Sequence, residues 1–201
     1  MALENLLDIA DNIQLAREKE RISKREALAL YRDGSLDDMT PGTYEALAAI
    51  HRRLFGSINA FAGKTRSANI AKGNFRFASV AYLDAAIKAV ESMPQSSAKE
   101  IIDKYVEMNV VHPFREGNGR AMRIWVDHIF RNELGLSIDW SGIDREDYLF
   151  AMERSPIRST EIKGLIMQAL VPVDDAPALL ARSIDASYAY EGYDAYSAAD
   201  L

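Results

Sequence analysis

The sequence predicts a mainly α-helical fold with one small β-hairpin, and three observations lead to this prediction. Apolar residues recur at helical spacing in most segments of the 201-residue chain, as in helices that bury one face. Glycine and proline residues separate these segments. The helical pattern is broken between residues 63 and 78, where the residue types favour a hairpin.

Two helices are expected before this break. The first covers residues 3–32 and ends before Gly34, and the second covers residues 43–55, after the turn at 40–42. The charged run 17–25 is interpreted as a solvated helical face rather than as a binding patch. The residues expected to form the apolar face of the first helix are Leu6, Ile9, Ile13 and Leu28.

The break itself is expected to form a hairpin. Residues 64–66 and 75–77 flank Gly73-Asn74, a pair suited to a two-residue hairpin turn. Helices are expected again after it, with Pro94 between the first two. Their ranges are 80–93, 98–111, a helix starting around residue 119, 144–152, 160–170 and about 175–192.

The last of these helices has clear boundary signals. Aspartates precede it, Pro177 lies in its first turn, and Gly192 is a good stop signal. Ser187 and Glu191 are four residues apart, so they share one face of the helix. Its apolar face is expected to consist of Leu180, Ile184 and Tyr188.

Composition narrows the possible functions. The length suggests one domain, residues 1–201, and the formal net charge of −6 argues mildly against a nucleic-acid binder. Cysteine is absent, which excludes disulfides and thiolate zinc sites and fits a cytoplasmic protein. The first residues do not read as a secretion signal, and no apolar stretch is long enough to span a bilayer.

Residues 112–123 read HPFREGNGRAMR and concentrate groups that are used in phosphate chemistry. Glycines in 117–119 let the backbone N–H groups approach a ligand, and a helix that starts there points its positive end at an anion. Arg120 and Arg123 are three apart and can grip phosphate oxygens together. Other nucleotide signatures, such as GxxxxGK[ST] and GxGxxG after a strand, are missing, as is the zinc motif HExxH.

A possible base and a possible metal ligand lie in the same stretch. His112 precedes Pro113, so it is expected at the exit of a helix, and an imidazole can take a proton near neutral pH. Glu116 offers carboxylate oxygens, which Mg²⁺ prefers together with substrate phosphates. Phe114 is expected to anchor the loop in the core, whereas His51 and His128 are interpreted as ordinary helical residues.

This stretch is similar to the Fic family motif, His-x-Phe-x-Asp/Glu-Gly-Asn-Gly-Arg-x-x-Arg, at every specified position. The resemblance implies a Fic-type helical bundle with a small hairpin, and transfer of AMP from ATP to a protein hydroxyl. It implies His112 as general base and Glu116 as the Mg²⁺ ligand. The phosphate-binding residues that it implies are Gly117, Asn118, Gly119, Arg120 and Arg123, with Arg123 at the γ-phosphate.

The hairpin resembles the flap of the same family. There an extended segment of the target protein pairs with the flap edge, which is a form of strand addition. The flap residues implied for this chain are Lys72, Gly73, Asn74 and Phe75.

Residues 187–192 read SYAYEG and resemble the inhibitory motif of the family, Ser/Thr-x-x-x-Glu-Gly/Asn. Its C-terminal place is similar to that of single-domain Fic proteins. The resemblance implies that Glu191 pairs with Arg123 and takes the place of the γ-phosphate. Tyr188 and Tyr193 flank this glutamate, and one of them is expected to accept AMP in the released enzyme.

Two other functions stay open at this stage. Glu191 could orient a water that removes AMP from a modified target, or the chain could be a module that only binds nucleotide. The expected partners are ATP and a target protein, for which relatives suggest the ATPase subunits of type II DNA topoisomerases. No nucleic acid or membrane is expected as a partner, and a homo-oligomer stays possible.

Overall fold

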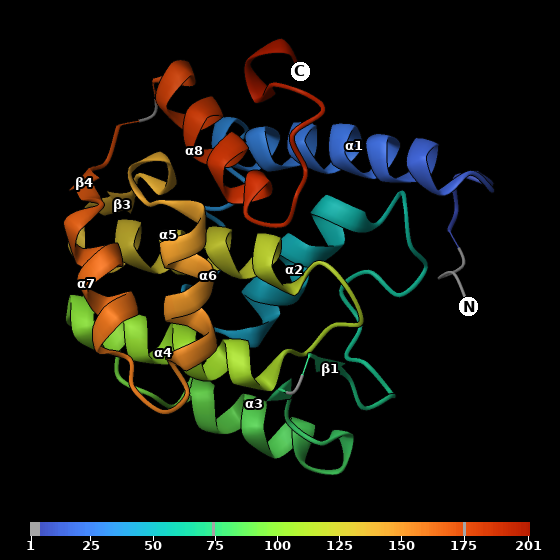
Figure 1. Ribbon diagram of the computed structural model, residues 1–201. Coiled ribbons are helices and arrows are strands. Elements are labelled where there is room, and N and C mark those ends of the chain that lie inside the picture. Colours follow the sequence, from blue (N-terminus) through green and yellow to red (C-terminus); the bar gives the residue numbers. More distant parts are fainter. Residues whose placement is uncertain (1–4, 74, 175) are drawn as a thin grey trace.

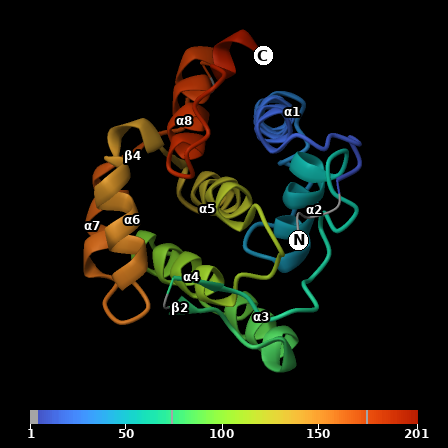
Figure 2. The same ribbon diagram turned by 45° about the vertical axis from the view of Figure 1, so that its right-hand side comes forward.

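A computed structural model of the chain describes residues 5–73, 75–174 and 176–201 and shows a helical bundle around one central helix. This helix, α5 (Asn118–Leu134), runs through the middle of the molecule in Figures 1 and 2. Its residues Trp125, Ile129 and Phe130 are fully buried. The mainly α-helical prediction is therefore confirmed.

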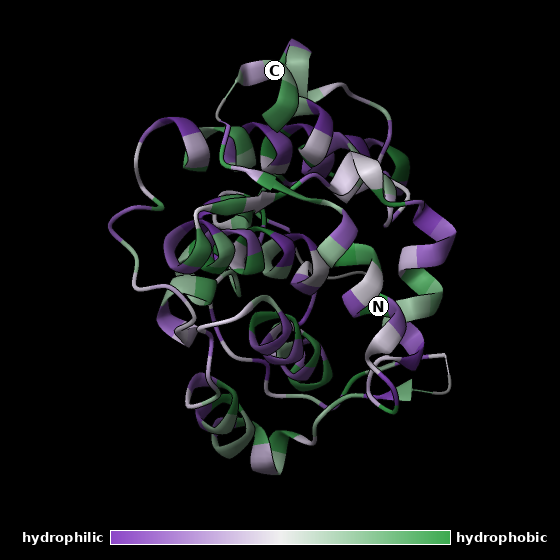
Figure 3. Cartoon of the chain, turned by 90° about the vertical axis from the view of Figure 1, so that its left-hand side faces the viewer, coloured by the Kyte–Doolittle hydropathy of each residue, from purple (hydrophilic) through white to green (hydrophobic). Residues whose placement is uncertain are grey.

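The other helices pack around α5. The turns of these helices carry both hydrophilic and hydrophobic residues, as expected of helices that bury one face (Figure 3). Within the described residues, no helix has both the length and the apolar character that a bilayer crossing requires. The bounds are α1 Asn12–Arg32, α2 Tyr44–Phe55, α3 Leu83–Glu91, α4 Ala98–Val111, α6 Arg145–Arg154, α7 Thr160–Gln168 and α8 Pro177–Ala189.

The first helix begins later than predicted, and part of its expected core face is wrong. The Asp11 side chain accepts a hydrogen bond from the Gln14 backbone N–H, so it caps a helix that starts at Asn12 rather than at residue 3. Leu6 is 57% exposed and Ile13 is 70% exposed. Leu28 is buried as predicted, and Leu15 near the start of α1 is buried as well.

The interpretation of residues 17–25 as a solvated face is correct for Arg17 and Arg25, which are exposed, but wrong for the opposite side of the helix. Lys19, Glu20 and Lys24 are buried, because each has partners of opposite charge or polar backbone partners supplied by distant segments. Paired charges can be buried at an acceptable cost in solvation free energy, whereas isolated ones cannot. These partners are far away in sequence, so the charge run alone gave no sign of them.

Two small antiparallel hairpins accompany the helices. The predicted one consists of β1 (Ala71–Lys72) and β2 (Phe75–Arg76), with Ala71 opposite Arg76, and is shorter than the predicted 64–77. The second, β3 (Leu136–Ile138) with β4 (Leu170–Pro172), was not predicted. Its strands are three residues long and follow directly on α5 and α7, which hides them from a pattern analysis.

The remaining helices differ from prediction only near their ends. α4 has the predicted bounds, and α7 ends at Gln168 because β4 begins two residues later. The segment predicted as helix 80–93 starts with a short 3₁₀ turn, Val80–Tyr82, before α3. Other 3₁₀ turns are Trp140–Gly142 and Ala198–Asp200.

The last helix, α8, is shorter at both ends than the predicted 175–192. It starts with Pro177 as its first residue, and Asp175 lies outside the described residues. It ends at Ala189, so Glu191 lies in the following turn, where Gly192 adopts a positive φ of 80°. Its predicted apolar face, Leu180, Ile184 and Tyr188, is buried as expected. In Figures 1 and 2, α8 lies beside α1 and above α5.

Candidate active site

His112 terminates α4 in an unusual backbone conformation. It caps the helix with φ 49° and ψ 65°, a left-handed conformation that is uncommon outside glycine. Pro113 follows and disfavours continued helix at His112. Such conformations persist where surrounding contacts enforce them, often at functional sites. The predicted place of His112 at the helix exit is correct.

The imidazole of His112 is held in one tautomer. Its Nδ1 lies 3.2 Å from the Asn109 carbonyl oxygen, which can only accept, so Nδ1 carries the proton and Nε2 keeps a free lone pair. Phe77 from the end of the hairpin stacks on the ring at 3.7 Å between centroids. Burial lowers the pKa of His112 to about 4. The ring is therefore neutral at physiological pH and able to accept a proton at Nε2.

The loop after His112 is closed by its own side chains. The Asn118 side chain accepts from the Phe114 N–H and donates to the Phe114 carbonyl, both at 2.8 Å. Phe114 is fully buried, as predicted, and it stacks on His51 at 3.9 Å. Asn118 thus uses its side chain to shape the loop. Among the phosphate-binding residues that the resemblance implies, Asn118 can therefore contribute its backbone N–H.

The start of α5 has the backbone of an anion-binding turn. Gly117 caps the helix at φ 78°, and a Cβ atom there would lie 2.5 Å from the Phe55 ring. A Cβ atom at Gly119 would collide with the Glu191 carboxylate. The two glycines therefore allow this turn and let a carboxylate approach it closely, at the positive end of the helix.

Two positioning residues were missed from sequence. His51 was interpreted as an ordinary helical residue, but its Nε2 donates to the Glu116 carbonyl oxygen at 2.8 Å and its Nδ1 accepts from the Gly63 N–H at 2.9 Å. Burial lowers the pKa of His51 to about 4, so it serves as a neutral bridge. Arg66 is 5% exposed and donates from Nε to the His112 carbonyl at 2.8 Å, which ties the segment before the hairpin to the loop. Arg66 was predicted to lie in the hairpin, and nothing in the sequence indicated this contact.

Glu116 lies between two cations. Its carboxylate is 3.1 Å from Lys19 Nζ and 3.8 Å from Arg120 Nη2, and its side chain is 29% exposed. Among the residues that the structure describes, no cluster of three or more histidine or acidic side chains could hold a metal ion. Mg²⁺ commonly takes only one or two carboxylates when substrate phosphates supply other ligands. One accessible carboxylate beside an anion-binding turn fits a metal of that kind.

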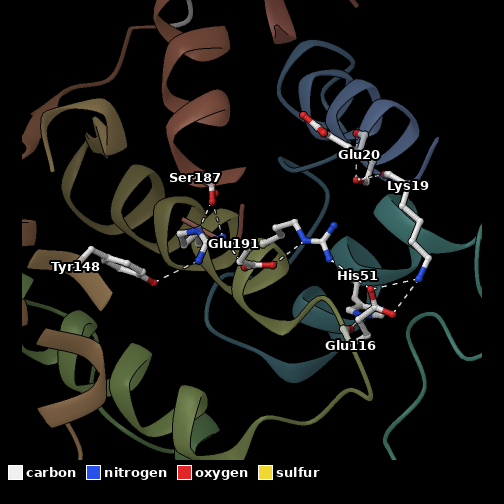
Figure 4. Close-up of polar contacts among 10 residues, drawn as sticks. Lys19, Glu20, His51, Glu116, Tyr148, Ser187 and Glu191 are labelled. Carbon is white, nitrogen blue, oxygen red and sulfur yellow. Dashed lines mark hydrogen bonds and ion pairs between the residues drawn. The ribbon is translucent and has the colours of Figure 1, made fainter. Parts of the chain in front are cut away.

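Glu191 reaches the two arginines of the motif. Its carboxylate lies 3.0 Å from Arg120 Nε and 2.7 Å from Arg123 Nη2 (Figure 4). Burial would raise the pKa of Glu191, but the charges of Arg120 and Arg123 outweigh this and hold it below its usual value. Arg123 also donates from Nε to the Ser187 hydroxyl at 2.7 Å and from Nη1 to the Tyr148 hydroxyl at 3.4 Å. Ser187 and Glu191 therefore meet the arginines that the sequence assigned to phosphate binding.

A buried cluster of charges ties α8 to α1. Lys24 on α1 is 1% exposed and lies 3.0 Å from both Glu20 and the α8 residue Asp185. It also donates to the Tyr196 carbonyl oxygen at 2.5 Å, and Glu20 accepts from the N–H groups of Ala195 and Tyr196. The N-terminal helix and the C-terminal tail thus both bind α8 at Asp185.

Replacing Lys24 by methionine should lower the free energy of unfolding by about 3 kcal/mol, because the buried Glu20 carboxylate loses its neutralising partner. Urea denaturation of the purified chain measures this change. Arg25→Met on the same helix is the matched control, because Arg25 is 51% exposed, and we expect a change below about 0.5 kcal/mol. Equal stability of Lys24→Met and the parent protein would show that the cluster does not stabilise the fold.

The hairpin lies beside the loop of His112. Phe75 contacts Phe77, which in turn stacks on His112. Lys72 and Gly73 are exposed at the tip, and Asn74 lies outside the described residues. Strands of two residues leave backbone groups available at the edge, as the predicted docking of a target requires.

Both tyrosines proposed for self-modification contact Arg120. The guanidinium carbon lies 5.6 Å from the Tyr188 ring centre and 4.5 Å from that of Tyr193. Tyr188 is 1% exposed, so its hydroxyl reaches a nucleotide only if α8 leaves its place. Tyr193 is partly exposed beyond the helix.

A neutral histidine, a glycine-rich helix start and two arginines meet at the core of a mainly helical fold. Residues 41–130 match the model of the Fic/DOC family, so this part of the chain is similar to a Fic domain.

Comparisons with known proteins agree with this assignment. The protein adenylyltransferase VbhT of Bartonella schoenbuchensis is 29% identical over 197 residues, covering 91% of this chain but 39% of VbhT. The probable protein adenylyltransferase y4lH of Sinorhizobium fredii is 28% identical over 165 residues, covering 76% of this chain and 82% of y4lH. The chain thus spans about two fifths of the length of VbhT.

Solved structures show the same fold. The BepC protein of Bartonella tribocorum, crystallised with bound AMPPNP, superposes with a TM-score of 0.69 at 21% identity, covering 86% of this chain and 93% of that one. The N-terminal Fic domain of a Bartonella quintana effector with bound ADP superposes with a TM-score of 0.70, covering 89% and 94%. The helical bundle with a hairpin is therefore the Fic fold.

Proposed function

We propose that this protein is a protein adenylyltransferase that moves AMP from ATP to a tyrosine, serine or threonine hydroxyl of a target protein. The observation that supports it best is the folded motif itself. His112, with a free Nε2 lone pair, ends one helix, and the glycine turn and arginines open the next. Relatives named as protein adenylyltransferases support the same reaction.

The chain's own groups account for each step. His112 Nε2 accepts the proton of the target hydroxyl, whose oxygen attacks the α-phosphorus of ATP. The bond from the α-phosphorus to the bridging oxygen breaks, and pyrophosphate leaves. Backbone N–H groups at the start of α5 stabilise charge on the phosphate oxygens, and Arg120 and Arg123 hold the distal phosphates. Positioning and electrostatic stabilisation are sufficient for this kind of transfer.

Glu116 is the residue that would hold Mg²⁺ together with the phosphates. The metal, when bound, would neutralise phosphate charge. His51 fixes the backbone of Glu116, so the carboxylate stays at the start of α5.

We assign Glu191 an inhibitory role in this reaction. Its carboxylate forms ion pairs with both arginines and lies next to Gly119, so it competes with the γ-phosphate for Arg123. Ser187 reinforces the contact through its bond to Arg123. ATP bound beside Glu191 would hold its α-phosphate out of line for attack.

The hairpin is proposed to dock the target as an added strand, with Lys72, Gly73, Asn74 and Phe75 at the contact. We treat residues 1–201 as one Fic domain that contains an N-terminal helix and the C-terminal inhibitory segment. The type II topoisomerase target, the cytoplasmic location and a possible homo-oligomer stay predictions from the sequence.

The reaction is tested with ATP labelled either at its α-phosphate or at its γ-phosphate. Glu191→Gly enzyme should transfer label to protein from the α-labelled nucleotide only. Label from the γ-position would indicate phosphate transfer instead. If AMP is removed from a premodified target and this removal requires Glu191, the AMP-removing function is favoured. If no variant shows turnover, the chain is a module that only binds nucleotide.

Dependence on Mg²⁺ should run through Glu116. Excess chelator should abolish transfer, and Glu116→Ala should lose about as much activity at ordinary Mg²⁺ concentration. Titrating Mg²⁺ against the rate of α-label transfer measures this, with exposed Glu146→Ala as the control. Full transfer by the parent enzyme in excess chelator would disprove the metal role.

A further inference from the structure

A lysine of the N-terminal helix reaches the acidic residue of the phosphate-binding loop. Lys19 lies on α1, and its Nζ is 3.1 Å from Oε2 and 3.4 Å from Oε1 of Glu116 (Figure 4). The Lys19 side chain is only 11% exposed. α1 lies outside residues 41–130, which match the family model. A segment beyond that match therefore supplies a cation to the candidate site.

Lys19 is the end of a row of alternating charges. Figure 4 shows the row crossing from α1 to the turn after α8. Each neighbouring pair lies within 3.8 Å. In order, the row consists of Lys19, Glu116, Arg120, Glu191 and Arg123.

The net charge of this row changes when Glu191 moves away from the arginines. Three cations then face the single carboxylate of Glu116, so the site has a net positive charge. A Mg²⁺–triphosphate complex keeps a net negative charge and would restore the balance. Lys19 contributes one of these three positive charges, and its side chain is largely shielded from water.

The ammonium of Lys19 needs an anion beside it. A cation that is 11% exposed has lost much of its hydration, and Glu116 supplies the compensating charge. If Glu116 also serves Mg²⁺, its charge is shared between two cations. Triphosphate oxygens at the same loop are the anions available to compensate Lys19.

We propose that Lys19 is a nucleotide-binding residue contributed by α1. It holds the Glu116 carboxylate at the loop before ATP binds, and it pairs with the triphosphate once ATP is bound. A lysine suits both states, because its ammonium is a compact charge on a flexible stem. This inference rests on the proposed ATP site.

The test measures nucleotide affinity by calorimetry in the Glu191→Gly protein, where the site is open. Lys19→Gln should weaken binding of Mg²⁺–ATP by about tenfold, as expected for loss of a charge-assisted contact. Adenosine, which lacks phosphates, should bind equally well to the parent and to Lys19→Gln. Lys19→Arg keeps the charge and should stay within about threefold of the parent.

Arg25→Gln is the matched control, because it removes one positive charge from an exposed position of the same helix. It should leave ATP affinity unchanged. Unchanged or tighter ATP binding by Lys19→Gln would overturn the proposal, and so would an equal loss of ATP and adenosine affinity, which would indicate a structural role. If the Glu191→Gly parent itself fails to bind ATP, the proposed function fails instead.

Discussion

Replacing His112 by alanine should lower AMP transfer by a factor of about 10² or more, measured in the Glu191→Gly background. In the proposed mechanism, His112 accepts the proton of the target hydroxyl at the free Nε2 lone pair, and the imidazole has no other assigned part. ATP affinity should change little, because the proposed mechanism assigns the phosphates to α5 and its arginines. A loss of ATP affinity comparable to the loss of rate would refute the assigned role.

The pH profile gives an independent check on His112. Because burial lowers its pKa to about 4, the imidazole is neutral over the physiological range and becomes charged only as pH falls toward that value. The rate should therefore vary little between about pH 6 and 8, whereas an ordinary histidine base would lose activity below about pH 6.5. A midpoint near 6.5 for transfer would show that the ring is more hydrated during catalysis than in this structure.

Replacing Glu191 by glycine should raise the rate of AMP transfer by at least about tenfold. This factor corresponds to ~1.4 kcal/mol of free energy by which Glu191 opposes the reaction. The variant removes the ion pairs at 2.7 and 3.0 Å and frees Arg123 for the γ-phosphate. Asp194→Gly is the control, since this exposed carboxylate lies three residues further along the chain. It should transfer AMP at the wild-type rate.

Released enzyme should also modify itself. Tyr188 is buried under Arg120 in the closed structure, so it becomes a substrate only when α8 leaves, whereas Tyr193 is partly exposed. Peptide mapping of Glu191→Gly after incubation with ATP should find AMP on one of the two. A bulky anion on Tyr188 cannot return to its packed place, so this modification would keep α8 from closing. Two unmodified tyrosines would disprove self-modification without affecting the inhibitory role.

The sequence predicted the parts of the site that are local in the chain. Residues 112–123 form one loop and the start of one helix, so their relative positions follow from their spacing in the sequence. Ser187 and Glu191 were placed on one face by helical spacing, although Glu191 lies just past the end of α8. Their contact with Arg123 was implied only by the family resemblance. The spacing of residues within a helix does not indicate which other helix it packs against.

Contacts between distant segments could not be predicted in this way. The burial of Lys24 depends on Asp185, far along the chain, and the role of Lys19 depends on Glu116. The sequence alone does not distinguish a charged helical residue that is exposed to solvent from one that forms a buried ion pair. His51 was missed for a similar reason, because its two hydrogen bonds join the loop of Glu116 and the turn at Gly63.

The most direct test compares wild-type and Glu191→Gly enzyme side by side for transfer of α-label to protein. The structure predicts at least about tenfold more label with Glu191→Gly, and loss of that gain in the double variant with His112→Ala. Equal labelling by wild type and Glu191→Gly would contradict the claim that the contact between Glu191 and Arg123 restrains the site.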